Sequence, residues 1–179
     1  MQSGARRWCA VLGGKERSLT WFWYGLSLAV VLLDQWTKQL ALGHFVLGQY
    51  QTITPFFDLT LAFNRGAAFS FLSDAGGWQR WFLTAISAGV SVALVVWLWR
   101  LGSQQRLLAL GLALVLGGAL GNLYDRLVLG YVVDFISLHY RQHYWPAFNV
   151  ADSAITCGAV LLFIDIFTAD TSEEESLER

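Results

Sequence analysis

The chain has 179 residues, of which 55% are hydrophobic and only 14% are charged, whereas soluble domains carry about a quarter charged residues. The formal net charge is −1, with basic residues gathered in the first 19 residues and glutamates gathered in the last eleven. This composition predicts a polytopic membrane protein and excludes a basic nucleic-acid-binding surface.

Four segments are candidates for membrane-spanning helices, because about 20 mostly apolar residues are needed to cross the hydrocarbon core. We expect these helices at about residues 20–42, 81–99, 107–124 and 151–168. The first has to continue through Asp34 and Lys38, since its uncharged part, residues 21–33, is too short to cross alone. The third contains Gly117 and Gly121 at a spacing that permits close helix packing, so we expect it at the centre of the bundle.

The distribution of basic residues predicts the orientation of the chain. The basic head, residues 1–19, and the turn that carries Arg100 and Arg106 are expected on the cytoplasmic side. Both termini, including the tail 169–179, would then be cytoplasmic, and the connections 43–79 and 125–150 would be extracytoplasmic. The first span leads into polar residues rather than into a small-residue cleavage site, so we expect it to remain as an anchor in a single membrane domain, 1–179.

The two outer connections also carry strand patterns. Apolar and polar residues alternate from Phe57 to Asn64, and Tyr131 to Tyr140 is rich in β-branched and aromatic residues. We therefore expect an all-α membrane protein with four transmembrane helices and a small extracytoplasmic β-sheet. Asp58 falls on the polar phase of the first strand and Asp74 lies in a glycine-rich turn, so solvation is expected for both.

Ionisable residues converge on the outer surface in this topology, where each needs a partner or a function. They are Asp34, Lys38, Asp125, Arg126, Asp134 and Asp152. The spacing of Asp34 and Lys38 predicts a structural ion pair within one helix. Arg126 is the candidate partner of Asp125, although sequence neighbours point in different directions on a helix.

Asp134 and Asp152 have no basic residue within four positions. If they lie together, they would repel each other unless they shared a proton, which is how an aspartyl peptidase works. An exposed loop residue and a helix N-cap are the alternative interpretations, and spacing alone leaves both open.

The sequence motifs of serine, zinc and cysteine chemistry are absent from the chain. The chain contains no G-x-S-x-G, no H-E-x-x-H and no paired cysteine motif, and Cys9 and Cys157 are expected to be free thiols. His139 and His143 lie four residues apart, but a strand in this region disfavours metal binding, so we expect no metal or cofactor. A small ion or proton transporter that uses intramembrane Asp and Lys is the main alternative function, followed by a presenilin-type protease and a catalytically idle scaffold.

Five motifs occur in order: Asp34-Gln35-Trp36-Thr37-Lys38, Asn64-Arg65-Gly66-Ala67-Ala68-Phe69, Gly121-Asn122-Leu123-Tyr124-Asp125-Arg126, Val132-Val133-Asp134-Phe135 and Phe148-Asn149-Val150-Ala151-Asp152-Ser153. Together they closely resemble the bacterial lipoprotein signal peptidases, or signal peptidase II. The resemblance covers about Trp21 to Phe167, which is nearly all of the chain outside the polar ends.

The resemblance implies a four-helix aspartyl endopeptidase of the bacterial inner membrane, with no metal or cofactor. Its substrates would be diacylglyceryl-modified prolipoproteins, cut just before the lipidated cysteine, and its other partners would be membrane lipids. A monomer is expected. The catalytic residues would be Asp134 and Asp152. Residues that line or support the substrate site would be Asn64, Gly118, Asn122, Arg126, Asn149 and Ala151, and those that hold the architecture would be Asp34, Lys38 and Asp125.

Overall fold

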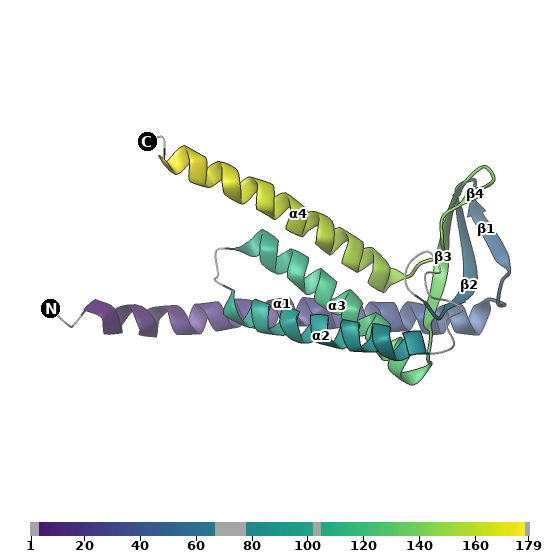
Figure 1. Ribbon diagram of the computed structural model, residues 1–179, viewed down its shortest axis with the longest axis horizontal. Helices are drawn as coiled ribbons and strands as arrows, with labels where there is room; N and C mark the ends of the chain where they lie inside the picture. Colours follow the sequence, from purple (N-terminus) through teal and green to yellow (C-terminus); the bar gives the residue numbers. More distant parts are fainter. Residues whose placement is uncertain (1–3, 67–77, 102–104, 178–179) are drawn as a thin grey trace.

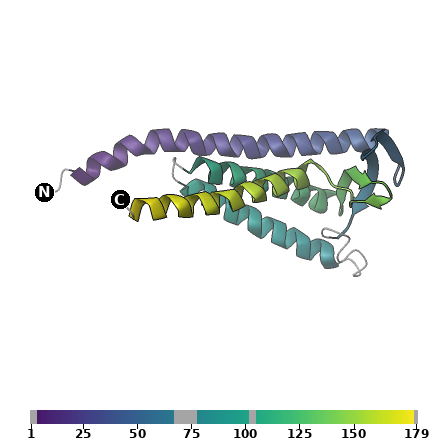
Figure 2. The ribbon, with the colours of Figure 1, turned by 90° about the horizontal axis from the view of Figure 1, so that it is seen from above.

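In the computed structural model, four long helices lie along one axis and a small sheet covers one end of them (Figure 1). The structure describes residues 4–66, 78–101 and 105–177, and the side chains of 19–66, 78–101 and 105–167. The helices are α1 (Gly4–His44), α2 (Trp78–Arg100), α3 (Arg106–Val128) and α4 (Val150–Leu177). Both termini lie at the end opposite the sheet (Figure 2).

Helix α1 begins at Gly4 rather than near residue 20, where the apolar run begins. No proline interrupts residues 4–44, and Ala, Leu, Arg and Lys are good helix formers, so the helix continues into the basic head. Among the described helices, α2, α3 and α4 through Phe167 are long and apolar enough to cross a membrane. The described part of the chain is thus mostly helical with three such helices, and α1 differs from them because polar residues interrupt its second half.

Helix α3 lies at the centre, as its glycine content predicted, and contacts each of the other three helices. A Cβ added at Gly117 would lie 2.7 Å from Cβ of Val30 on α1. At Gly121 it would lie 2.7 Å from Oδ2 of Asp34. The missing side chains therefore allow α1 to pass close to α3 at the level of the charged residues. Leucines of α2 and α3, including Leu98 and Leu112, form a buried cluster on another side of α3.

The sheet has four antiparallel strands in the order β1-β2-β3-β4. They are β1 (Tyr50–Thr54), β2 (Phe57–Asn64), β3 (Val132–Tyr140) and β4 (His143–Tyr144). The two central strands are those that the sequence predicted. The two outer strands were missed because β1 is short and mostly polar and β4 has only two residues. Leu61, Val133 and Phe135 pack with Ala41 of α1, which fixes the sheet on the end of that helix.

The expected solvation of Asp58 is wrong. Its exposed fraction is 1%, and its Oδ2 lies 3.4 Å from Nε2 of His139. Asp58 pairs in register with Ser137, so His139, two residues further along β3, lies on the same face of the sheet. The polar side chain of Asp58 on β2 therefore lies beside polar side chains of β3 and is not exposed to water. Asp74 lies outside the described residues.

Candidate active site

The two candidate catalytic aspartates come from different elements and are joined by one asparagine. Asp134 lies on β3 and is 2% exposed, whereas Asp152 lies in the first turn of α4. Nδ2 of Asn149 donates to Oδ1 of Asp134 at 2.7 Å, and the Asn149 backbone N–H donates to Oδ2 of Asp152 at 3.3 Å. The backbone N–H of Asp152 donates in return to Oδ1 of Asn149 at 2.9 Å. This reciprocal cap begins α4 and fixes both carboxylates relative to each other.

Asn122 of α3 holds Asp152 from the opposite side. Its Nδ2 donates to Oδ1 of Asp152 at 2.8 Å. Its Oδ1 accepts from Nζ of Lys38 at 3.0 Å and from Nδ2 of Asn149 at 3.3 Å. Because a lysine ammonium can only donate, this contact fixes which end of the Asn122 amide faces Asp152.

A buried charge cluster lies behind Asn122. Nζ of Lys38 is 2.7 Å from Oδ2 of Asp34, which is the predicted ion pair, and 2.8 Å from Oδ2 of Asp125. The proposed partnership of Asp125 with Arg126 is therefore wrong. Consecutive residues on a helix point about 100° apart, and position 125 faces Lys38 of α1. Arg126 points instead to other groups.

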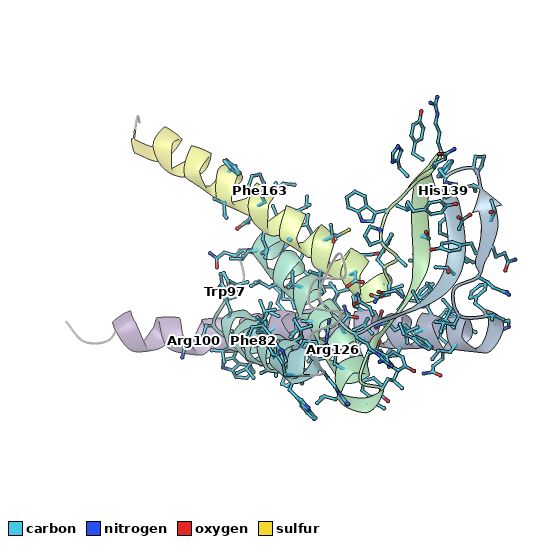
Figure 3. All side chains as sticks on the ribbon, turned by 45° about the vertical axis from the view of Figure 1, so that its right-hand side comes forward. Phe82, Trp97, Arg100, Arg126, His139 and Phe163 are labelled. Atoms are coloured by element: carbon cyan, nitrogen blue, oxygen red, sulfur yellow. The ribbon has the colours of Figure 1, made fainter. Side chains whose placement is uncertain are left out.

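Arg126 bridges α3 and the end of β2. Its Nη1 donates to the Asn122 backbone oxygen at 3.3 Å and its Nη2 to the Gly66 backbone oxygen at 3.4 Å. Its positive charge interacts favourably with Asp152 and Asp134. Figure 3 shows Arg126 near the junction of helices and sheet, and His139 far out on the sheet. Arg126 and Lys38 are thus the two cations of the described residues whose charges act on the aspartates.

Burial strongly raises the pKa of Asp134, and the negative charge of Asp152 raises it further, to about 7. Hydrogen bonds from Asn64 and Asn149 and the charge of Lys38 act in the opposite direction. Two acidic groups that interact in this way release their protons as a pair. Near neutral pH the pair therefore retains a proton that an isolated aspartate would have lost.

Two predicted site residues, Gly118 and Ala151, lie where α3 meets α4. A Cβ at Gly118 would collide with the Ala151 carbonyl oxygen and lie 2.7 Å from Cγ1 of Ile155. Ala151 is fully buried, and its backbone N–H donates to Oδ1 of Asp34 at 2.9 Å. These residues place the start of α4, and hence Asp152, against α3 and α1.

Gln35 of α1 also belongs to the buried charge cluster, although its sequence position alone did not predict this role. Nε2 of Gln35 donates to Oδ1 of Asp125 at 2.8 Å. The only signal was its position between Asp34 and Lys38 in the first motif. Within the described residues, no group of three or more His, Cys, Asp or Glu is arranged to hold a metal ion. His139 and His143 lie on paired strands, β3 and β4.

Comparison with known proteins identifies the family. The family model for signal peptidase (SPase) II matches residues 26–168. The chain belongs to the signal peptidase II family. This signal peptidase II homologue is therefore a peptidase of the aspartic type, and a transporter is not favoured.

Related proteins agree with that assignment. A lipoprotein signal peptidase of Teredinibacter turnerae is 62% identical over 143 residues, covering 80% of this chain and 85% of the relative. One of Pseudomonas putida is 55% identical over 163 residues, covering 90% of this chain and 94% of the relative. A solved structure described as a bacterial membrane enzyme superimposes with a TM-score of 0.73 at 32% identity, covering 83% of this chain and 88% of that one.

Proposed function

We propose that this protein removes the signal peptide from diacylglyceryl-modified prolipoproteins, cutting before the lipidated cysteine, with Asp134 and Asp152 as its catalytic pair. The single observation that carries the assignment is the position of Asn149, which is hydrogen-bonded to both carboxylates. The names of the relatives support the substrate class. Residues Asn64, Asn122 and Arg126 surround the pair, and Gly118, Asn149 and Ala151 hold it in place.

The chemistry follows from the different surroundings of the two carboxylates. Asp134, with a pKa of about 7, is the member that keeps the proton and donates a hydrogen bond to the scissile carbonyl oxygen. Asp152 lies at a helix N-terminus and accepts from Asn122, which favours its anion, so it takes a proton from water. The water oxygen bonds to the carbonyl carbon, the C–N bond breaks, and the departing nitrogen takes a proton from the pair.

The membrane arrangement that fits this site has four spans, with residues 20–42 of α1 as the first. Both termini lie at one end of the molecule and the sheet at the other, which supports an even number of crossings (Figures 1 and 2). Arg100 and Arg106 bound the turn at the end where the termini lie, which favours the cytoplasm there. The aspartates would then act at the outer face of the inner membrane, in a single chain.

The first experiment tests the pair. Asp134→Asn and Asp152→Asn keep the shape of the side chain but cannot exchange the proton, so each should lower turnover by about 10²- to 10⁴-fold or more. Asp58→Asn is a matched control, since Asp58 is a carboxylate as buried as Asp134 that takes no part in the pair. Turnover per mole of monodisperse protein is measured on a synthetic diacylglyceryl prolipoprotein peptide. Near wild-type turnover in either dyad variant would remove that residue from the mechanism.

The second experiment tests the substrate class. Outward-facing apolar side chains such as Phe82 of α2 and Phe163 of α4 are 48% and 62% exposed, and a lipid-facing surface of this kind accommodates acyl chains. Because buried CH₂ groups contribute about 0.8 kcal/mol each, the diacylglyceryl peptide should be cleaved far faster than the same peptide without lipid. Equal cleavage of the two peptides would reject the lipidated substrate while leaving the catalytic pair intact.

A further inference from the structure

The C-terminal turn of α3 presents backbone carbonyls that the helix itself cannot satisfy. The backbone N–H groups of Leu129 and Gly130 both donate to the Asp125 carbonyl, at 2.7 and 3.1 Å. The next two carbonyls in the chain, those of Arg126 and Leu127, accept instead from Arg80 of α2. Nε of Arg80 donates to the first at 2.8 Å and Nη2 donates to the second at 2.9 Å.

The guanidinium of Arg80 is held in this position from two further sides. Its Cζ lies 5.0 Å from the centroid of the Trp81 ring, within the range of a cation–π contact. Gly130 adopts a φ of +87°, and a Cβ there would lie 3.0 Å from Nη1 and 3.2 Å from Cζ of Arg80. The glycine therefore supplies both the backbone conformation and the space that this arginine requires.

Arg126 lies in the turn that Arg80 caps, and Asn122 lies one turn earlier on the same helix. Asn122 donates to Asp152, and Arg126 donates to Gly66 and interacts with both aspartates. A shift of this turn would displace the Arg126 charge relative to the two aspartates. A displacement of about 1 Å at a catalytic group costs about 10²-fold in rate.

We propose that Arg80 is a positioning residue for catalysis, which acts through the last turn of α3 to hold Arg126 beside the aspartate pair. It does not contact the substrate. The inference rests on the proposed catalytic pair of Asp134 and Asp152. It adds an element of the site on α2, a helix that contributes none of the site residues expected from the sequence.

The test compares Arg80→Gln with Arg80→Lys and with Arg100→Gln. Arg100→Gln is the matched control, because it removes an exposed cation from the other end of α2. Steady-state kinetics on the lipidated peptide are recorded from pH 5 to pH 9, approximately the range over which a group titrating near neutrality changes state. We expect kcat of Arg80→Gln to fall about 10- to 100-fold with little change in KM. Arg80→Lys should recover part of the loss, since it retains the charge but cannot donate the same fork of two bonds.

The pH profile distinguishes positioning from a purely structural role. When the Arg126 cation moves away from the carboxylates, they hold their protons more tightly, so the limbs of the kcat/KM profile should move to higher pH. A wild-type kcat and profile in Arg80→Gln would overturn the proposal, as would the same shift in Arg100→Gln. If Arg80→Gln does not fold, Gly130→Ala takes its place, because the added methyl displaces the arginine without removing it. Wild-type behaviour of both Gly130→Ala and Arg80→Lys would then overturn the proposal.

The same assay separates this inference from the one on which it rests. Active Asp134→Asn or Asp152→Asn would show that the catalytic pair itself is wrong. Inactive dyad variants beside a fully active Arg80→Gln would reject only the role of Arg80.

Discussion

Lys38 and Asp125 form an ion pair between α1 and α3, with Nζ 2.8 Å from Oδ2 and both side chains 1% exposed. Asp34 contacts the same ammonium group at 2.7 Å. The other carboxylate oxygens accept from neighbouring donors, namely Gln35 and the backbone N–H of Ala151. One cation therefore balances two buried carboxylates, and it also donates to Asn122 of the site.

This shared cation predicts a non-additive effect on stability. Asp34→Asn leaves Lys38 paired with Asp125, and Asp125→Asn leaves it paired with Asp34. Each single variant should therefore lose little free energy of unfolding and retain most activity per folded molecule. The double variant leaves a buried ammonium without a counter-charge, which costs about 3–5 kcal/mol. Thermal unfolding of the three purified variants and the wild type gives the double-mutant cycle. Losses that simply add would show that the two carboxylates do not share Lys38.

The raised pKa of Asp134 predicts a pH dependence of stability. In the unfolded chain this group titrates near 3.8, and in the folded protein near 7, so the folded state holds a proton that the unfolded state releases between these values. The resulting stabilisation is fully present below about pH 4 and is lost as the pH rises to about 7, by an amount on the order of a few kcal/mol. Asp134→Asn cannot ionise and should lack this decline. Unfolding temperatures of the wild type and Asp134→Asn at pH 5 and pH 8 measure this decline. Equal declines in both proteins would show that Asp134 is not the group with the raised pKa.

The same pKa predicts how activity depends on pH. The proposed mechanism needs one proton on the pair, so kcat/KM should fall as the pH rises above about 7 and this proton is lost. Initial rates in buffers of constant ionic strength give the profile. An alkaline limb absent up to pH 9 would mean that the group with a pKa of about 7 is not required in its protonated form.

Inhibitor classes provide an independent test of the aspartic mechanism. Cys157 lies exposed on α4 and takes no part in the proposed chemistry, so thiol reagents should leave turnover unchanged and Cys157→Ser should remain active. Serine-directed reagents and chelators should also leave turnover unchanged, since neither an activated serine nor a metal takes part in the proposed chemistry. Loss of activity with a chelator, restored by a divalent ion, would reject the aspartic mechanism.

Local patterns were the predictable part of this molecule. The i to i+4 spacing of Asp34 and Lys38 correctly predicted their ion pair. The alternation from Phe57 to Asn64 correctly predicted both the first and the last residue of β2. The partners of Asp125 and Asp58 were not predictable, because Lys38 and His139 are brought to them only by the packing of α1 on α3 and by the register of β2 on β3.

The candidate site was predictable only in part for the same reason. Asp134 and Asp152 were singled out because each lacks a nearby basic residue in the sequence. Their joint contact with Asn149 could be found only in the tertiary structure. The backbone N–H of Asn149 donates to Asp152 on α4, whereas its side-chain amide donates to Asp134 on β3.

The packing of α4 on α3 leads to a final prediction about a residue that carries no functional group. A methyl group at Gly118 would collide with the Ala151 carbonyl oxygen, which is backbone and cannot turn away, so Gly118→Ala must push the start of α4 away from α3. Overpacking of this kind typically costs about 1–3 kcal/mol. Because Asp152 lies one residue after Ala151, the hydrogen bond from Asn122 to Asp152 should lengthen, and turnover should fall along with stability.

Gly89→Ala is the matched control for this substitution. Gly89 lies within α2, and nothing lies within 4 Å of a Cβ added there, so this variant should be fully active and up to about 1 kcal/mol more stable through helix propensity. Turnover per folded molecule and thermal unfolding are measured for both variants in the same detergent. If Gly118→Ala matched Gly89→Ala in both measurements, the close approach of α3 and α4 would not be what places Asp152 in the site.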